Sequence, residues 1–70
     1  MMLLAFANVG ERNTIKKIVG SPKVKQHLND LGFVAGAGVE IISTFDGNLI
    51  VNVKNVRVAI SKEMAGKIMV

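Results

Sequence analysis

Apolar residues recur along this chain with two different periods, and the first period is helical. The spacing of one helix face is carried by Val24, Leu28 and Leu31. Ser21 can cap a helix that begins at Pro22, because proline suits the first helical position. Gly32 suits a left-handed helix end, after which Phe33 can fold back as the apolar contact of that cap. We therefore predict one helix over residues 22–31.

A period of two begins at Val39 and indicates strands with one buried face. The predicted strands are, in chain order, residues 14–19, 39–45, 49–53, 56–61 and 68–70. Ser61 is expected to cap a single helical turn over residues 62–65. About five short strands with one inserted α-helix predict a mostly β fold, a small SH3-like β-barrel, in one domain over residues 1–70.

The loop of the first hairpin decides which side chains face the core. A two-residue loop, residues 46–47, would oppose Ile41 to Asn52. A three-residue loop, residues 46–48, pairs Ile41 with Val53 and puts nearly every strong apolar residue on one face. We choose the three-residue loop. The predicted inner face is then Val39, Ile41, Phe45, Leu49, Val51, Val53, Val56, Val58 and Ile60.

The opposite face of these strands is predicted to carry Glu40, Ile42, Thr44, Ile50, Asn52, Arg57 and Ala59. A two-residue loop in the second hairpin places Ile50 beside Ala59 and Arg57 opposite Asn52. Apolar residues rimmed by a charge on an outward face mark partner sites. The candidate partner-binding residues are Ile42, Ile50, Arg57 and Ala59. The alternative is that the helix or the N-terminal segment covers them.

Groups suited to catalysis or metal binding are scarce. The sequence has no cysteine, one histidine and five acidic residues, which excludes disulfides and thiolate metal sites. His27 with Asp30 at i+3 offers fewer ligands than the roughly three or four of a zinc site. Gly36 and Gly38 fit neither the phosphate-binding nor the dinucleotide-binding pattern. We expect no enzyme, no catalytic residue, no cofactor and no metal site.

Charge and aromatic content bear on the partner. The net charge of +4 favours anionic partners, although the basic residues are scattered. Binders of single-stranded nucleic acid stack bases on exposed aromatic rings. Because Phe45 is assigned to the core and Phe33 to the helix cap, only Phe6 remains, and we expect no nucleic-acid partner. The apolar run at residues 1–7 is too short to span a bilayer, so we expect a cytoplasmic protein.

A series of short segments runs in a fixed order through nearly the whole chain, at residues 9–11, 28–33, 36–41, 47–51, 57–60 and 65–70. In this order and spacing they resemble the ferrous iron transport protein A (FeoA) family. Ala35 and Asn48 stand where that family usually has proline. Ile60-Ser61 replaces a common Leu-Arg pair, which removes one positive charge from a surface that could contact a partner.

The resemblance implies an SH3-like barrel with a role in ferrous iron transport. Members of the family are cytoplasmic accessories of FeoB, a membrane transporter with a GTPase domain. They modulate it by docking and do not carry iron, although the family is also associated with transition metal ion binding. Such a partner would bring the chain to the inner membrane, where its positive charge suits an anionic leaflet.

Three alternatives stay open. One is a regulatory module of the kind attached to some metal-dependent repressors, and another is a small RNA-binding barrel. The third is a homo-oligomer formed through the apolar strand face. RNA binding would weaken steeply with salt, whereas apolar docking would not.

Overall fold

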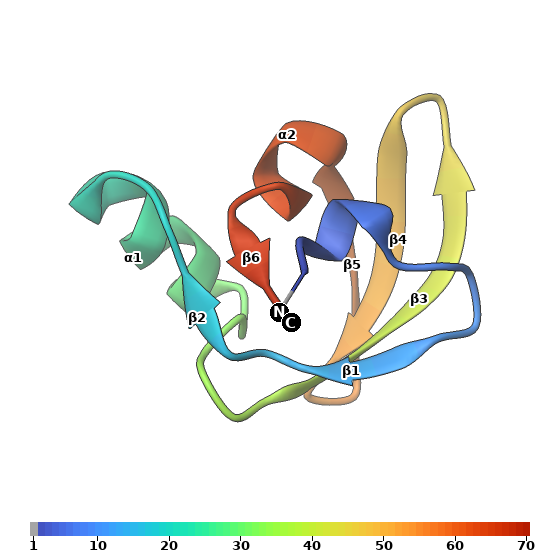
Figure 1. The fold of residues 1–70 in the computed structure, drawn as a ribbon, viewed down its shortest axis with the longest axis horizontal. Helices are drawn as coiled ribbons and strands as arrows, with labels where there is room; N and C mark the ends of the chain where they lie inside the picture. Colours follow the sequence, from blue (N-terminus) through green and yellow to red (C-terminus); the bar gives the residue numbers. More distant parts are fainter. Residues whose placement is uncertain (1) are drawn as a thin grey trace.

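The computed structural model describes residues 2–70 (Figure 1). The elements are, in chain order, the 3-10 helix η1 (Leu4–Phe6), β1 (Arg12–Thr14), β2 (Lys17–Ile18), α1 (Pro22–Asp30), β3 (Gly38–Phe45), β4 (Asn48–Val53), β5 (Val56–Ser61), α2 (Lys62–Ala65) and β6 (Ile68–Met69). A four-stranded sheet has the order β1-β3-β4-β5, and β2 pairs with β6. All strand pairs are antiparallel. The predicted mostly β fold with one main helix is confirmed.

The chain passes from one sheet to the other at Ile15. The Ile15 N–H donates to the carbonyl of Ala37 at 2.9 Å, whereas the next residue, Lys16, donates to the carbonyl of Met69 at 2.7 Å. The strand expected at residues 14–19 is therefore two shorter strands, because the chain turns here from β3 towards β6. Hydrogen bonds do not close the barrel: within residues 2–70, β5 pairs with β4 alone. The outer edge of β5 is therefore unpaired, although a closed barrel would leave no free sheet edge.

Helix α1 forms as predicted and ends one residue earlier. The Ser21 hydroxyl accepts from the Val24 N–H at 3.3 Å, which caps the first turn. At the other end the Gly32 N–H donates to Asn29, and the Phe33 N–H donates to the carbonyl of Leu28 at 2.9 Å. These two bonds make a Schellman cap, and Gly32 has the positive φ of 108° that this cap requires. The cap delivers Phe33 into the core.

The β3–β4 hairpin departs from the predicted register. Its loop has two residues, Asp46 and Gly47, with φ of 47° and 78°, so Phe45 pairs with Asn48. A bulge between Ile41 and Ser43 adds one residue to β3, and Ile41 pairs with Val51. An Asp-Gly pair suits a turn with two positive φ angles. The bulge then returns the start of β3 to the alternation that buries its apolar residues.

The β4–β5 hairpin follows the prediction. Val51 pairs with Val58, and Ile50 pairs with Ala59. The loop residues Lys54 and Asn55 have φ of 51° and 63°, again a turn with two positive angles.

The core draws on both sheets, α1 and η1. Its buried side chains are Leu4, Ile15, Leu28, Phe33, Val39, Ile41, Leu49, Val51, Val53, Ile60, Ala65, Ile68 and Val70. Three residues predicted for the inner face are not among these buried side chains: Phe45 is 67% exposed, Val56 is 57% exposed and Val58 is partly exposed. The bulge in β3 turns Phe45 away from the core. Val56 lies at the end of β5, on the unpaired edge of the sheet.

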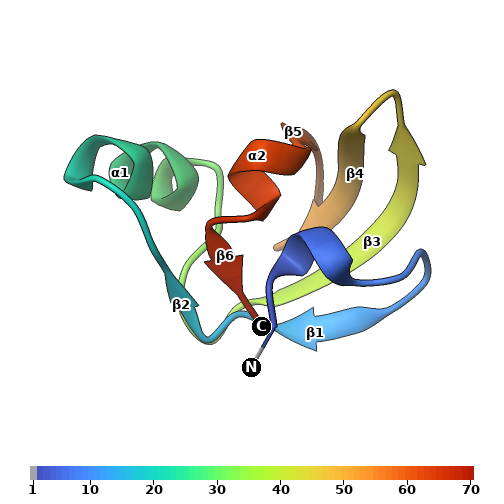
Figure 2. The same cartoon turned by 45° about the horizontal axis from the view of Figure 1, so that its top comes forward.

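One end of the molecule is helical and the other is a β-hairpin. Helix α1 lies at one end, beside β2, and the β3–β4 hairpin projects at the other (Figures 1 and 2). The chain termini meet between them, where Met2 and Val70 exchange two backbone hydrogen bonds of 2.9 and 2.7 Å.

Candidate partner-docking face

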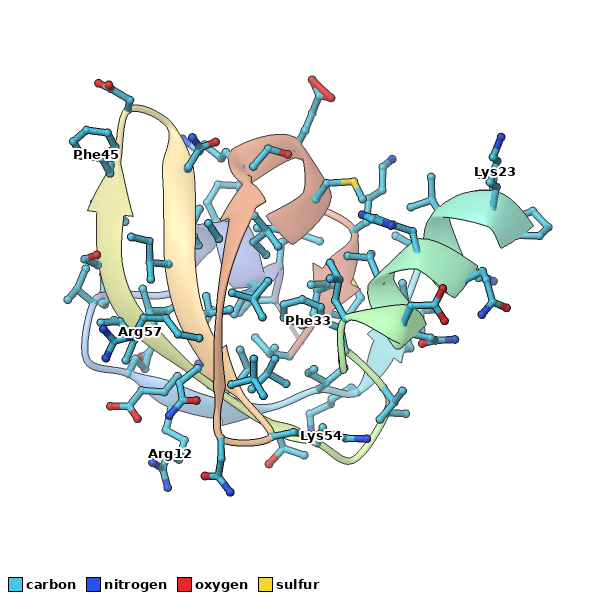
Figure 3. All side chains as sticks on the ribbon, turned by 180° about the vertical axis from the view of Figure 1, so that it is seen from behind. Arg12, Lys23, Phe33, Phe45, Lys54 and Arg57 are labelled. Atoms are coloured by element: carbon cyan, nitrogen blue, oxygen red, sulfur yellow. The ribbon has the colours of Figure 1, made fainter. Side chains whose placement is uncertain are left out.

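The outward side of β3, β4 and β5 is the candidate site, and we call it the outer face. Strand alternation and the observed register assign to it Glu40, Ile42, Ser43, Phe45, Asn48, Ile50, Asn52, Arg57, Ala59 and Ser61. Figure 3 shows Phe45 and Arg57 on this side of the sheet, away from the buried Phe33. Thr44, which was predicted here, pairs with the inner residue Leu49 because of the bulge.

One end of the outer face is a polar row that continues onto β1. Arg12 pairs with Glu40, Glu40 with Asn52, and Asn52 with Arg57, so the row crosses all four strands. A nitrogen of the Arg12 guanidinium lies 3.1 Å from Glu40 Oε1, and this is the ion pair found within residues 2–70. A hollow of 240 Å³ beside this row is lined by Arg12, Gly38, Glu40, Asn52, Lys54 and Asn55.

The middle of the outer face is an apolar row. Ile50 pairs with Ala59 on one side and with Ser43 on the other, and the bulge brings Ile42 next to Ser43. Ala59 is exposed, while Ile42 and Ile50 are partly exposed. Of the four residues predicted for partner binding, the structure therefore places Ile42, Ile50 and Ala59 together, with Arg57 in the adjoining polar row.

Neither element proposed as a cover lies over the outer face. Helix α1 sits at the far end of the molecule from the β3–β4 hairpin and turns Leu28 into the core. The N-terminal segment, through Leu4 of η1, also packs into the core. The outer face consequently remains accessible to a partner.

Phe45 is the member of this face that the sequence prediction missed. It pairs with Asn48 at the end of the outer face, two residues along β3 from Ser43 and diagonal to Ile50. The signal that would have found it is Asp46-Gly47, since a two-residue loop of this type fixes Phe45 opposite Asn48. With Phe45, the apolar part of the outer face reaches the tip of the hairpin.

Metal and membrane features are limited in the described part of the chain. No group of three or more His, Cys, Asp or Glu side chains comes together among residues 2–70. His27 is exposed on α1, and Asp30 accepts a 2.8 Å hydrogen bond from Gln26. Over the same residues, no helix combines the length and the apolar character needed to cross a bilayer.

The fold defines a small SH3-like β domain with an uncovered sheet face. Comparison with protein families places it more closely: residues 2–70 match the model of the FeoA domain. The chain belongs to the FeoA domain family. A Methanocaldococcus jannaschii protein named "Putative Fe(2+) transport protein A" is 36% identical over 70 residues, which are 100% of this chain and 85% of that protein. The resemblance to the FeoA family is thus confirmed.

Solved structures agree with this assignment. A crystal structure of an iron uptake regulatory protein (FeoA) is 29% identical, with a TM-score of 0.90 over 97% of this chain and 90% of that one. FeoA from Stenotrophomonas maltophilia, crystallised with zinc and described as an SH3 domain protein, is 20% identical with a TM-score of 0.85 over 99% and 88%. A manganese-dependent transcriptional repressor shares the fold alone, at 17% identity and a TM-score of 0.85 over 94% of this chain and 38% of that one. The predicted SH3-like fold is confirmed.

Proposed function

We propose that this chain is a cytoplasmic adaptor that docks on the cytoplasmic part of the ferrous iron transporter FeoB and regulates it by contact. Membership of the FeoA family and the Fe(2+) transport name of its archaeal relative support the transport role. The observation that carries the docking role is the uncovered outer face, where Ile42 and Ile50 lie beside the polar row that holds Arg57, and Phe45 extends the apolar part to the hairpin tip. Partly exposed apolar residues beside a cation fit a protein partner.

Binding to purified FeoB cytoplasmic domain tests this proposal. We expect the labelled chain to show amide shifts concentrated in β3, β4 and β5 when that domain is added. Ile50→Glu should weaken binding by about tenfold or more, because it places a carboxylate in a contact that is dry in the complex. The titration and the substitution therefore test the same face of the sheet.

Val19→Glu is the matched control for Ile50→Glu. Val19 is also partly exposed, but it follows β2 at the α1 end of the molecule. It should bind within about twofold of the native chain, since a tenfold change needs about 1.4 kcal/mol of lost contact. Unchanged binding by a folded Ile50→Glu variant would overturn docking through the outer face.

A second candidate function follows from the exposure of the aromatic rings. The expectation of no nucleic-acid partner assumed a buried Phe45, whereas Phe6 and Phe45 are 68% and 67% exposed. Exposed rings on a chain of net charge +4 suit base stacking on single-stranded RNA. Titration with RNA at two salt concentrations separates the candidates, because an RNA complex should weaken steeply with salt and apolar docking should not.

A further inference from the structure

The edge of β5 that faces away from β4 carries unpaired backbone groups. Val53 and Val56 flank a two-residue loop, so they form a hydrogen-bonded pair. Hydrogen-bonded and non-hydrogen-bonded pairs then alternate along β4 and β5, and the 3.0 Å bond from the Lys62 N–H to the carbonyl of Gly47 agrees with this alternation. Arg57 and Ala59 fall between the hydrogen-bonded pairs. Their N–H and C=O groups therefore point away from β4, and within residues 2–70 they meet no backbone partner.

The inner face of the sheet is only partly covered at the start of this same edge. On β4, Val53 and Val51 are 1% and 0% exposed. Their partners on β5 are Val56, which is 57% exposed, and Val58, which is partly exposed. Helix α2 packs against the far end of β5, where Ile60 is 5% exposed. If another strand were added beside β5, its apolar side chains would cover Val56 and Val58.

Cations follow β5 from one end to the other. Lys54 precedes the strand and Arg57 lies within it, and both are exposed. Lys62 follows the strand, next to the exposed Glu63, and lines a hollow with Gly47 and Asn48 on the β4 side. The ion pair described within residues 2–70 joins Arg12 to Glu40 and uses none of them. Their charge therefore favours acidic residues on whatever approaches this edge.

We propose that β5 binds an extended segment of its partner as an added strand, in which apolar residues alternate with acidic ones. The apolar residues would cover Val56 and Val58, the acidic ones would meet Arg57, and the backbone would pair with Arg57 and Ala59. A second copy of this chain is disfavoured because its own β5 would bring the same cations into contact. This inference rests on the proposed function, since it specifies how the docked partner engages the sheet.

A synthetic peptide of four Val-Glu repeats tests strand addition directly on the whole chain. We expect the amides of Arg57 and Ala59 to shift and to become protected from hydrogen exchange, while the hydrogen-bonded amides of β5 keep their existing protection. A Val-Lys peptide of the same length should bind at least about tenfold more weakly, because its cations approach Arg57 and Lys54. Shifts without protection at Arg57 and Ala59 would overturn the proposal.

Ala59→Pro supplies a second test, because proline removes an N–H that faces the open edge and leaves the β4 ladder intact. We expect binding of the Val-Glu peptide and of the FeoB cytoplasmic domain to fall about tenfold or more. Ala59→Val keeps the N–H and should bind more tightly than Ala59→Pro, while Val19→Glu, at the α1 end of the molecule, should bind within about twofold of the native chain. If Ala59→Pro does not fold, protection of Arg57 and Ala59 in the native complex decides the question.

The outcomes separate this inference from the proposed function. If Ile50→Glu abolishes binding of the FeoB domain while Ala59→Pro leaves it unchanged, the docking face stands and strand addition is wrong. If the peptide pairs with β5 and the FeoB domain does not bind, strand addition stands and the proposed partner is wrong. Absence of both complexes would overturn both.

Discussion

The two faces of the sheet formed by β3, β4 and β5 differ in composition and in cover. Val51 and Ile50 are neighbours in β4, yet Val51 is fully buried and Ile50 is partly exposed. The inner face packs against side chains from α1, α2 and η1, whereas no helix within residues 2–70 covers the outer face. Because no buried polar side chain occurs within residues 2–70, stability rests on the inner face. The proposed docking would use the outer face, which contributes less to stability.

The strongest test of this division is Phe33→Ala. Phe33 is fully buried, and truncating a buried phenylalanine costs about 3–5 kcal/mol of unfolding free energy. A chain of 70 residues has a total of about 4–10 kcal/mol. We expect a urea midpoint reduced by about a third or more, measured by circular dichroism. A loss below about 1 kcal/mol would show that the core does not depend on this ring.

A smaller effect is expected from a matched pair in β4, Val51→Thr and Ile50→Thr. Both keep a β-branched side chain, so strand propensity changes little. Val51→Thr buries a hydroxyl without a partner and should lower the free energy of unfolding by about 1–3 kcal/mol. Ile50→Thr should lose less than about 1 kcal/mol, because its side chain is partly hydrated already. Equal losses in urea denaturation would contradict the division between faces.

Local signals in the sequence predicted the parts of this fold that depend on local chemistry. Ser21, Pro22 and Gly32 gave the helix and its cap to within one residue. The second hairpin has the predicted register because its residues alternate without interruption. In both cases neighbouring residues carry the information, so a single sequence suffices.

The first hairpin shows where that information ends. Its Asp46-Gly47 turn and the bulge near Ile42 set the register together. Either feature without the other would turn the apolar residues at the start of β3 away from the core. A regular two-residue hairpin would oppose Ile41 to Asn52, which is why the three-residue loop seemed better. Bulges have no reliable sequence signal. The candidate face was consequently found in part, from Ile42 and Ile50, while Phe45 was assigned to the wrong side.

The Arg12–Glu40 ion pair offers a third, smaller test. The two side chains are 75% and 32% exposed, and exposed pairs contribute about 0.2–1 kcal/mol. Glu40→Gln should lower the free energy of unfolding by no more than this, and the difference should shrink in high salt. A double-mutant cycle with Arg12→Gln measures the pair itself. A coupling of several kcal/mol would mean that the outer face also carries stability.

Phe45→Ala should have the smallest effect on stability, and it sharpens the comparison most because it is the same substitution as Phe33→Ala. Phe45 is 67% exposed, so its removal gives up little buried area, and we expect a change within about 0.5 kcal/mol. If the three-residue loop were correct, Phe45 would lie in the core and the loss would approach 3–5 kcal/mol. Urea denaturation of the two variants side by side therefore tests the bulge as well as the faces. A Phe45→Ala variant that keeps its stability and loses affinity for the partner would place this ring in the docking surface.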